Sequence, residues 1–215
     1  MIKKIIFDVD GTLLNTQKDC MDTYYEFFKS KKVDDYHEFS IKLYNLIEKF
    51  DSETKDYNKI DLCKFINDNI GLDLNEEEYN DIFSIYQKHG TLLNDGIKDT
   101  LEKLSKSYEL VTLSKWYVKD QDERLKVSGI RKYFKEVYGI ENAGLKPNKN
   151  AFITACGDYS IDECLMVGDS MKSDIGGARQ IKMNAVLIDP EGKNKYKNKI
   201  KSINELEEFI KRRNL

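Results

Sequence analysis

The sequence predicts an α/β protein in which a parallel sheet carries helices on both faces and an all-α segment is inserted after the first strand. A short apolar run opens the chain, and a long proline-free stretch with helical periodicity follows it. From about Leu92 onward, short apolar runs alternate with helical segments. Strands that alternate with helices indicate a parallel sheet wound on both faces. The core is therefore expected to be Rossmann-like.

The predicted division of the chain is a core of residues 1–16 and 90–215 and a helical cap domain of residues 17–89. Lys3–Phe7 is predicted to be a buried strand. Between residues 17 and 88, apolar side chains recur at spacings of three and four, which indicates about four amphipathic helices. The segment Leu13–Thr16 is the expected hinge between the two parts.

Each later element of the core is predicted from a local signal. The expected strands are Glu109–Leu113, Lys135–Tyr138, Cys164–Asp169 and Ala185–Asp189. The expected helices are Ile97–Ser105, Lys119–Val127, a helix opened by Lys146-Pro147 and running through Cys156, Ser173–Gln180, and Ile203–Arg212. Proline suits the first turn of a helix, so Pro147 is placed there. The basic stretch Lys193–Lys201 is expected to be a solvated helix or loop face.

Composition excludes several classes of function. The 35 Lys and Arg residues against 38 Asp and Glu give a net charge of −3, so no nucleic-acid partner is expected. No apolar run approaches the roughly 20 residues of a membrane span, and the first run is too short for a signal peptide. Four cysteines without a C-x-x-C pair favour a reducing, cytoplasmic setting. Only two histidines are present, so any catalysis is expected to depend on carboxylates.

Polar residues follow the predicted strands at the edge where a parallel sheet binds its ligands. Asp8 and Asp10 come after the first strand, Ser114 and Lys115 after the second, and Asp169 after the strand that begins at Cys164. Side chains two apart on an extended chain point to the same side, so the first two carboxylates are expected to converge. An ordinary Asp-Gly turn explains the first pair alone, but not the whole set.

The carboxylates predict a metal site. Asp169 adds a third carboxylate and Asp174 a possible fourth. Such a cluster is unfavourable without a cation, because neighbouring carboxylates raise one another's pKa. Mg²⁺ prefers oxygen ligands and commonly shares its shell with substrate phosphate. Beside this cluster, Ser114, Lys146 and turn amides offer donors for phosphoryl oxygens, although a lone Lys146 is more simply a surface lysine. The spacing does not fit an EF-hand, and no P-loop is present.

Four short segments in this order resemble the signatures of one enzyme family. They are "DVDGT" (8–12), "TLS" (112–114), "GLKP" (144–147) and "VGDSMKSD" (167–174). The chain resembles the haloacid dehalogenase-like hydrolase superfamily, in its phosphatase branch. The helical stretch after the first segment resembles the small α-helical cap of that branch.

The resemblance implies a role for each matching residue. Asp8 is expected to be the nucleophile that forms an aspartyl-phosphate. Asp10 is expected to protonate the leaving oxygen and then to activate water. The expected ligands of Mg²⁺ are the Asp8 carboxylate, the Asp10 backbone carbonyl and Asp169, with Asp174 behind them or steering Lys146. The expected phosphate-binding groups are Ser114, Lys146 and the backbone amides at Gly11 and Thr12.

One position departs from the family pattern. Lys115 stands where relatives often carry Asn, and Trp116 follows it. Lys115 is therefore either a phosphate-binding residue, through its amide or its charge, or a surface lysine. Retention of Asp10 favours phosphate esters, because an alkoxide leaving group needs a proton donor and a halide does not.

The sequence therefore predicts a Mg²⁺-dependent phosphomonoester hydrolase that acts on a small phosphorylated metabolite through an aspartyl-phosphate. The alternatives are a phosphosugar mutase of the same fold and a non-catalytic phosphate-binding module. A monomer and a dimer are both compatible with the sequence. The substrate is not identified, but cap tyrosines are candidates to contact the leaving group or to pack within the cap: Tyr24, Tyr25, Tyr44, Tyr57, Tyr79 and Tyr86.

Overall fold

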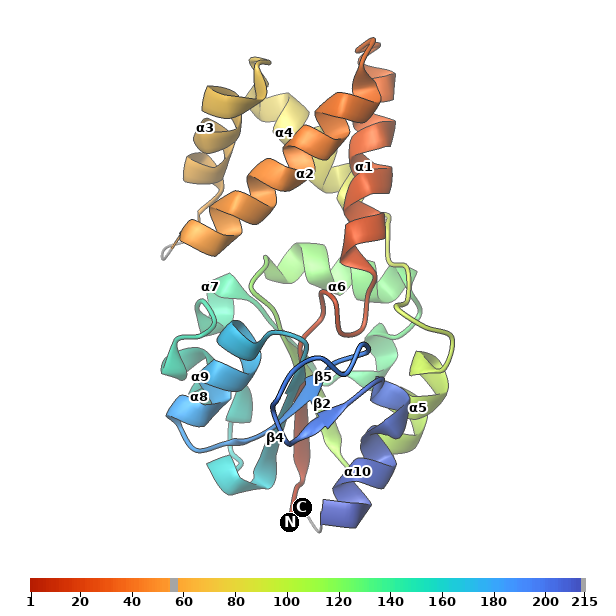
Figure 1. Cartoon of the computed structure of the whole chain (residues 1–215), viewed down its shortest axis with the longest axis vertical. Coiled ribbons are helices and arrows are strands. Elements are labelled where there is room, and N and C mark those ends of the chain that lie inside the picture. The colour runs from red at the N-terminus through yellow and green to blue at the C-terminus, as the bar shows by residue number, and fades with distance from the viewer. Residues whose placement is uncertain (55–57, 214–215) are drawn as a thin grey trace.

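A six-stranded sheet forms the centre of the core (Figure 1). The computed structural model of the chain describes residues 1–54 and 58–213. The strand order is β3-β2-β1-β4-β5-β6, and every neighbouring pair is parallel. The strands are β1 Lys4–Phe7, β2 Glu109–Leu113, β3 Glu136–Tyr138, β4 Cys164–Gly168, β5 Asn184–Ile188 and β6 Lys199–Ile200. The predicted α/β fold with a parallel Rossmann-like sheet is confirmed.

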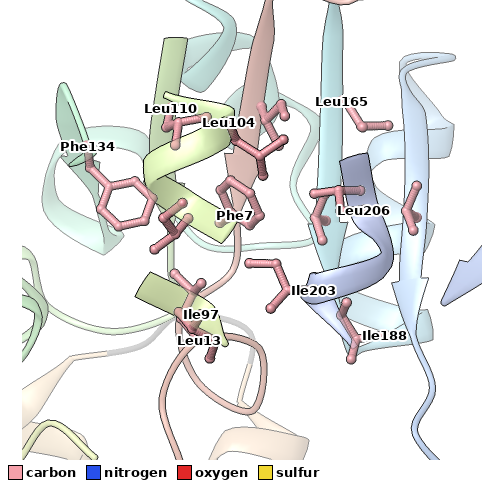
Figure 2. Close-up of a cluster of buried hydrophobic side chains, with 14 of the residues drawn as sticks. Phe7, Leu13, Ile97, Leu104, Leu110, Phe134, Leu165, Ile188, Ile203 and Leu206 are labelled. Atoms are coloured by element: carbon pink, nitrogen blue, oxygen red, sulfur yellow. The ribbon is translucent and has the colours of Figure 1, made fainter. Parts of the chain in front are cut away.

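Alternate residues of each strand face opposite sides of the sheet, and both sides are covered by helices. Ile5 and Phe7 belong to one buried apolar cluster, whereas Ile6 between them belongs to another. Figure 2 shows the first cluster, in which Phe7 lies with Leu104 and Leu206. The central strand is therefore buried on both faces, as its continuous apolar sequence predicts.

The core helices and helical turns flank this sheet. The helices are α5 Ile97–Leu104, α6 Val118–Val127, α7 Ile140–Ala143, α8 Lys149–Cys156, α9 Gly176–Gln180 and α10 Leu206–Arg213. The shorter turns are η1 Arg131–Tyr133, η2 Ile161–Glu163, the π-turn η3 Met171–Ile175 and η4 Ile203–Glu205. All four cysteines are free thiols.

Three elements of the core differ from the expectations. The helix expected to be opened by Lys146-Pro147 begins at Lys149, because the side chain of Asn148 accepts a hydrogen bond from the Asn150 amide and caps the helix there. The short helix α7 was not expected. Within the basic stretch expected to be solvated, Lys199 starts strand β6 and pairs with Asp189 at 2.8 Å. Lys199 therefore belongs to the edge strand of the sheet and is not part of a solvated helix or loop face.

Four helices form a separate part above the carboxyl ends of the strands (Figure 1). They are α1 Thr16–Ser30, α2 Tyr36–Glu53, α3 Lys59–Ile70 and α4 Glu76–Tyr86. Their inward side chains make an apolar cluster of their own, which includes Phe28, Leu43 and Ile66. We call this part the cap. In the described residues, no helix is both long and apolar enough to cross a membrane.

Two paired segments join the cap to the core. Leu14 and Leu92 form an antiparallel bridge, and the Asn15 amide donates to the Thr91 carbonyl at 2.8 Å. The Leu93 amide donates to the Leu13 carbonyl at 3.0 Å. The chain therefore enters and leaves the cap through one narrow, hydrogen-bonded connection, which limits how the cap can move relative to the sheet.

Candidate active site

The register of the sheet brings the three predicted strand ends together. Phe7 lies opposite Thr112 on one side and Val167 on the other. The residues that follow these strands therefore share one edge. The amide of Asp8 donates to the Val167 carbonyl at 2.9 Å, which extends the pairing and fixes the backbone of this aspartate.

A buried ammonium group joins two of the aspartates. Lys146 Nζ lies 2.6 Å from Asp8 Oδ1 and 2.6 Å from Asp174 Oδ1. Burial disfavours the ammonium charge, but the two carboxylates outweigh this cost and raise the pKa of Lys146. Lys146 is thus charged at the site, and it is held by two partners rather than exposed as a surface lysine.

A third carboxylate stands beside this ion triplet. Oxygens of Asp8, Asp169 and Asp174 all lie within 4.8 Å of one another. Burial raises the pKa of Asp8 well above its usual range, and the carboxylate of Asp174 raises it further. Because Asp174 is bonded to Lys146 and to the Ser170 amide, Asp8 and Asp169 keep the oxygens best placed for a cation. An all-oxygen donor set of this kind fits Mg²⁺.

The turn after β1 is shaped around Asp169. Gly11 has φ of +76°, and a Cβ on it would lie 2.5 Å from Asp169 Oδ2, so a larger residue is excluded there for two reasons. Thr12 is buried, and its hydroxyl donates a hydrogen bond to Asp169 Oδ1 at 3.4 Å. In this structure Thr12 therefore supports a carboxylate, whereas Gly11 lines the open space above the site.

Asp10 has partners different from those of Asp8. Four donors surround its carboxylate: Thr16 Oγ1, Ser114 Oγ at 3.2 Å, Gln121 Nε2 and Arg124 Nη1 at 2.7 Å. Burial raises the pKa of this carboxyl, but the Arg124 charge and the hydrogen bond from Thr16 outweigh it and lower the pKa. The two aspartates of the first signature are therefore in opposite electrostatic environments, although both line the same cavity.

Helix α6 supplies two of these donors, and the sequence analysis missed both. Gln121 and Arg124 are completely buried on the face of α6 that turns toward Asp10. Arg124 Nη2 also lies 2.9 Å from Asp19 in cap helix α1, and its guanidinium stacks on the Tyr86 ring of α4 at 4.2 Å. The only signal in the sequence is the spacing of three between two polar residues, which is equally typical of an exposed helix face.

Ser114 and Lys115 make their side-chain contacts with residues other than those of the Lys146 triplet. The Ser114 hydroxyl accepts hydrogen bonds from Gln121 and from the Trp116 amide, and it is fully buried. Lys115 Nζ lies 2.7 Å from Asp51 Oδ2 near the end of cap helix α2. In this structure Lys115 therefore links the core to the cap, and it also lines the cavity above the carboxylates, so its expected role in phosphate binding stays a prediction.

A cavity of about 520 Å³ lies between the carboxylates and the cap. Four of the cap tyrosines line it, namely Tyr24, Tyr44, Tyr79 and Tyr86. Tyr25 instead packs against the rings of Tyr36 and His37, and Tyr57 lies outside the described residues. The volume of the cavity is in the range of small-molecule binding sites.

Comparisons with known sequences give relatives over most of the chain. The family model described as haloacid dehalogenase-like hydrolase matches residues 5–188. "Putative pyrophosphatase PpaX" of Clostridium perfringens is 29% identical over 183 residues, which cover 82% of this chain and 79% of that protein. "Putative HAD-hydrolase YfnB" of Bacillus subtilis is 27% identical over 112 residues, 50% of this chain. The match to YfnB spans about half of that protein, 48% of its length.

Solved structures of similar fold cover nearly the whole chain. Magnesium-bound YfnB aligns with a TM-score of 0.78 at 19% identity, over 97% of this chain and 98% of that one. A 2-haloacid dehalogenase from Pseudomonas syringae aligns with 0.71 at 19% identity, over 99% of both chains. A HAD phosphatase from Thermococcus onnurineus aligns with 0.67 at 25% identity, over 97% and 98%. From the family match and from the four signatures around this cavity, the chain belongs to the haloacid dehalogenase-like hydrolases.

Proposed function

We propose that this chain is a Mg²⁺-dependent phosphomonoester hydrolase that uses Asp8 as its nucleophile. The observation that carries the proposal is the buried Lys146, which holds Asp8 at 2.6 Å beside Asp169 in the cavity under the cap. A fixed carboxylate next to a buried cation and a cation-binding oxygen is suited to attack an anionic phosphoryl group.

The proposed reaction has two steps. In the first, an Asp8 oxygen attacks phosphorus, the bond to the leaving oxygen breaks, and the protonated Asp10 gives that oxygen its proton. In the second, the Asp10 carboxylate takes a proton from water, the water oxygen attacks phosphorus, and the bond to Asp8 breaks to release phosphate. The ionised Asp10 of this structure corresponds to the form needed for the second step.

The first step requires a different position of Asp10. A carboxyl bonded to Arg124 is held in its ionised form, so Asp10 must leave this partner to carry a proton to the leaving oxygen. We infer that it rotates from the α6 side toward the cavity, which it already lines. Ser114 is freed by the same movement to face the phosphoryl group.

The donor set fits Mg²⁺, which Asp8, Asp169 and the Asp10 carbonyl would hold. When bound, the ion supplies positive charge against the phosphoryl oxygens and lowers the repulsion from Asp8. Asp174 fixes Lys146 from behind. The magnesium-bound structure of the relative YfnB supports this assignment.

Three alternative functions are less well supported. Dehalogenases share the fold, but halide needs no proton donor, whereas this chain has Asp10 in the lining of the same cavity as Asp8. A phosphosugar mutase needs polar partners for sugar hydroxyls, whereas the cap side of this cavity is largely apolar. A phosphate-binding module has no evident need for Asp10.

The proposal is tested with a panel of phosphorylated metabolites and 4-nitrophenyl phosphate in the presence of Mg²⁺. We expect release of free phosphate from at least one compound, and loss of activity by a factor of at least about 10³ in Asp8→Asn, because the nucleophile is removed. Full activity in Asp8→Asn would contradict the covalent route. Isomerised sugar phosphate without free phosphate would select the mutase.

A further inference from the structure

The cavity above Asp8 continues into the interior of the cap. Helices α2, α3 and α4 line its far part with aliphatic and aromatic side chains: Leu43, Ile47, Leu62, Ile66, Ile82 and Phe83. These three helices form the upper part of the molecule in Figure 1. A leaving group that extends from a phosphorus atom at Asp8 would therefore pass from the carboxylates into apolar surroundings.

The uncharged polar side chains that α2, α3 and α4 contribute to the cavity lining are those of three tyrosines, Tyr44, Tyr79 and Tyr86. The hydroxyl of Tyr79 lies 2.9 Å from the Cys63 carbonyl oxygen and 2.7 Å from Asn67 Oδ1, so its one proton is already engaged within the cap. A sugar or nucleoside placed here would bury more hydroxyl groups than these tyrosines can pair, at a cost for each one left without a partner. A hydrocarbon group loses no hydrogen bonds on entering the cavity and gains the free energy of leaving water.

The charges at the mouth of the cavity also discriminate among leaving groups. Beyond Asp8, Asp10, Asp169 and Lys146, the charged lining residues in the described part of the chain are Glu48, Asp51 and Lys115. Lys115 is bonded to Asp51 at 2.7 Å. Glu48 has no hydrogen bond or ion pair among the described residues; partial burial and the Asp51 carboxylate raise its pKa, although the Lys115 ammonium acts in the opposite direction. Glu48 and Asp51 therefore place two carboxyl groups at the cavity against the one ammonium group of Lys115.

We propose that the cap cavity receives the leaving group of the phosphomonoester, and that this group is uncharged and composed mainly of hydrocarbon, such as an alkyl chain or an aryl ring. The inference rests on the proposed function of the same site. It adds that anionic leaving groups are rejected at Glu48 and that polyhydroxylated ones are rejected by the apolar walls. Pyrophosphate, whose leaving group is itself phosphate, is therefore a poor substrate, in contrast to the activity named for the relative PpaX.

The test of the apolar walls is a series of n-alkyl phosphates from methyl to hexyl phosphate. Their leaving groups differ little in chemistry but add one methylene at a time. We expect kcat/KM to rise by about fourfold for each methylene that enters the cavity, and then to reach a plateau. Methyl phosphate hydrolysis without any rise along the series would overturn the inference and leave the proposed function standing. Absence of hydrolysis of every alkyl and aryl phosphate would instead overturn the proposed function.

Two isoleucines of α3 give a matched pair of variants. Ile66 lines the cavity and is 2% exposed, whereas Ile60 is 81% exposed on the same helix. Ile66→Phe is expected to fill part of the cavity, so that kcat/KM reaches its plateau at a shorter alkyl chain. Ile66→Ala is expected to enlarge the cavity, so that the plateau is reached at a longer chain. Ile60→Phe is expected to reproduce the wild-type series. If Ile66→Phe does not fold, the plateau of Ile66→Ala decides, since an unchanged plateau contradicts the inference.

The test of the charge compares phenyl phosphate, 4-carboxyphenyl phosphate and pyrophosphate. We expect kcat/KM for the carboxylated ester to be at least tenfold lower than for phenyl phosphate, and pyrophosphate to be lower still. In Glu48→Gln the ratio of the two esters should fall by about threefold, since one opposing charge is removed. The control is Glu38→Gln, which neutralises an exposed residue in the first turn of the same helix. Preference for the carboxylated ester or for pyrophosphate would overturn the inference.

Discussion

At the scale of single residues, Arg124 links the candidate acid–base residue to the cap. One guanidinium contacts Asp10 through Nη1 and Asp19 through Nη2, and all of it is shielded from solvent. Asp19 also accepts hydrogen bonds from the Thr91 amide, in the second segment that joins cap and core. The orientation of Asp10 is therefore tied to the connection between the two parts.

We expect Arg124→Lys to slow the hydrolysis of alkyl phosphates by at least about tenfold and that of 4-nitrophenyl phosphate much less. A lysine ammonium reaches one carboxylate and not two, so Asp10 is less well positioned. Departure of a poor leaving group, such as an alkoxide, depends on the proton from Asp10, whereas 4-nitrophenolate leaves without it. The measurement is the rate of leaving-group release in a single turnover, which reports the first step alone, on both substrates, with Asp10→Asn expected to show the same selectivity.

Two comparisons separate positioning from a general loss of structure. The double variant Asp10→Asn/Arg124→Lys should be no slower than Asp10→Asn, because the two residues act through one group. Arg131→Lys, at an ion pair with Asp122 on the core surface, should leave both rates unchanged. Equal slowing of both substrates by Arg124→Lys would show that Arg124 supports only the fold.

At the scale of elements, the ends of β1 and β4 set the metal site. They place Asp8 and Asp169 at one edge of the sheet, and the amide of Asp8 pairs with β4. The apolar runs and the residues after them predict this meeting, since parallel strands end at a common edge. The sequence does not predict α7, β6 or the start of α8, because short elements depend on caps and single side-chain pairs such as Lys199–Asp189.

Mg²⁺ is expected to raise the midpoint of thermal unfolding. At a free concentration one hundred times its Kd, a ligand specific for the folded state adds about 2.7 kcal/mol, or about 5–10 °C for a chain of this size. Burial and Asp174 raise the pKa of Asp8, so protons compete with the ion at low pH. The rise in the unfolding midpoint that Mg²⁺ causes should therefore be larger at pH 8 than at pH 5.5.

The controls are two aspartates with different surroundings. Asp169→Asn should remove most of the increment, because it removes one of the cation-binding carboxylates. Asp162→Asn changes an exposed residue in η2 and should keep the whole increment. An increment that persists in Asp169→Asn, or that grows as the pH falls, would contradict the site.

At the scale of the whole molecule, several ion pairs and side-chain hydrogen bonds join the cap to the core, and they include Lys59–Asp120 at 3.9 Å. Asp19 meets Arg124 in a buried ion pair, Gln87 donates to Asp120 at 2.6 Å, and Lys115 meets Asp51 at 2.7 Å. The Asp19 and Gln87 contacts lie close to the connecting segments, whereas Asp51 is near the end of the long helix α2. The Lys115 contact therefore depends more than these two on how the cap is rotated.

We expect the Lys115–Asp51 pair to contribute little to stability and more to substrate binding. The Asp51 side chain is 40% exposed, and pairs of this kind are worth at most about 1 kcal/mol. A double-mutant cycle of Lys115→Ala and Asp51→Ala, measured by urea unfolding, should give a coupling below that value. KM should rise in both single variants, because the cap then covers the cavity less often. A coupling of several kcal/mol, or an unchanged KM, would contradict this role.

The sequence by itself determined which polar residues follow each apolar strand. Because parallel strands end at a common edge, it also predicts that Asp8, Asp10 and Asp169 meet there. Strand periodicity and the short reach of the motifs are local properties, so they can be read along the chain. Only the tertiary structure decided the partners of those residues. Arg124 lies 114 residues from Asp10 and Asp51 lies 64 residues from Lys115, and such pairs form only when helices pack face to face. The apolar cavity in the cap depends on the same packing, because each of its walls comes from a different helix.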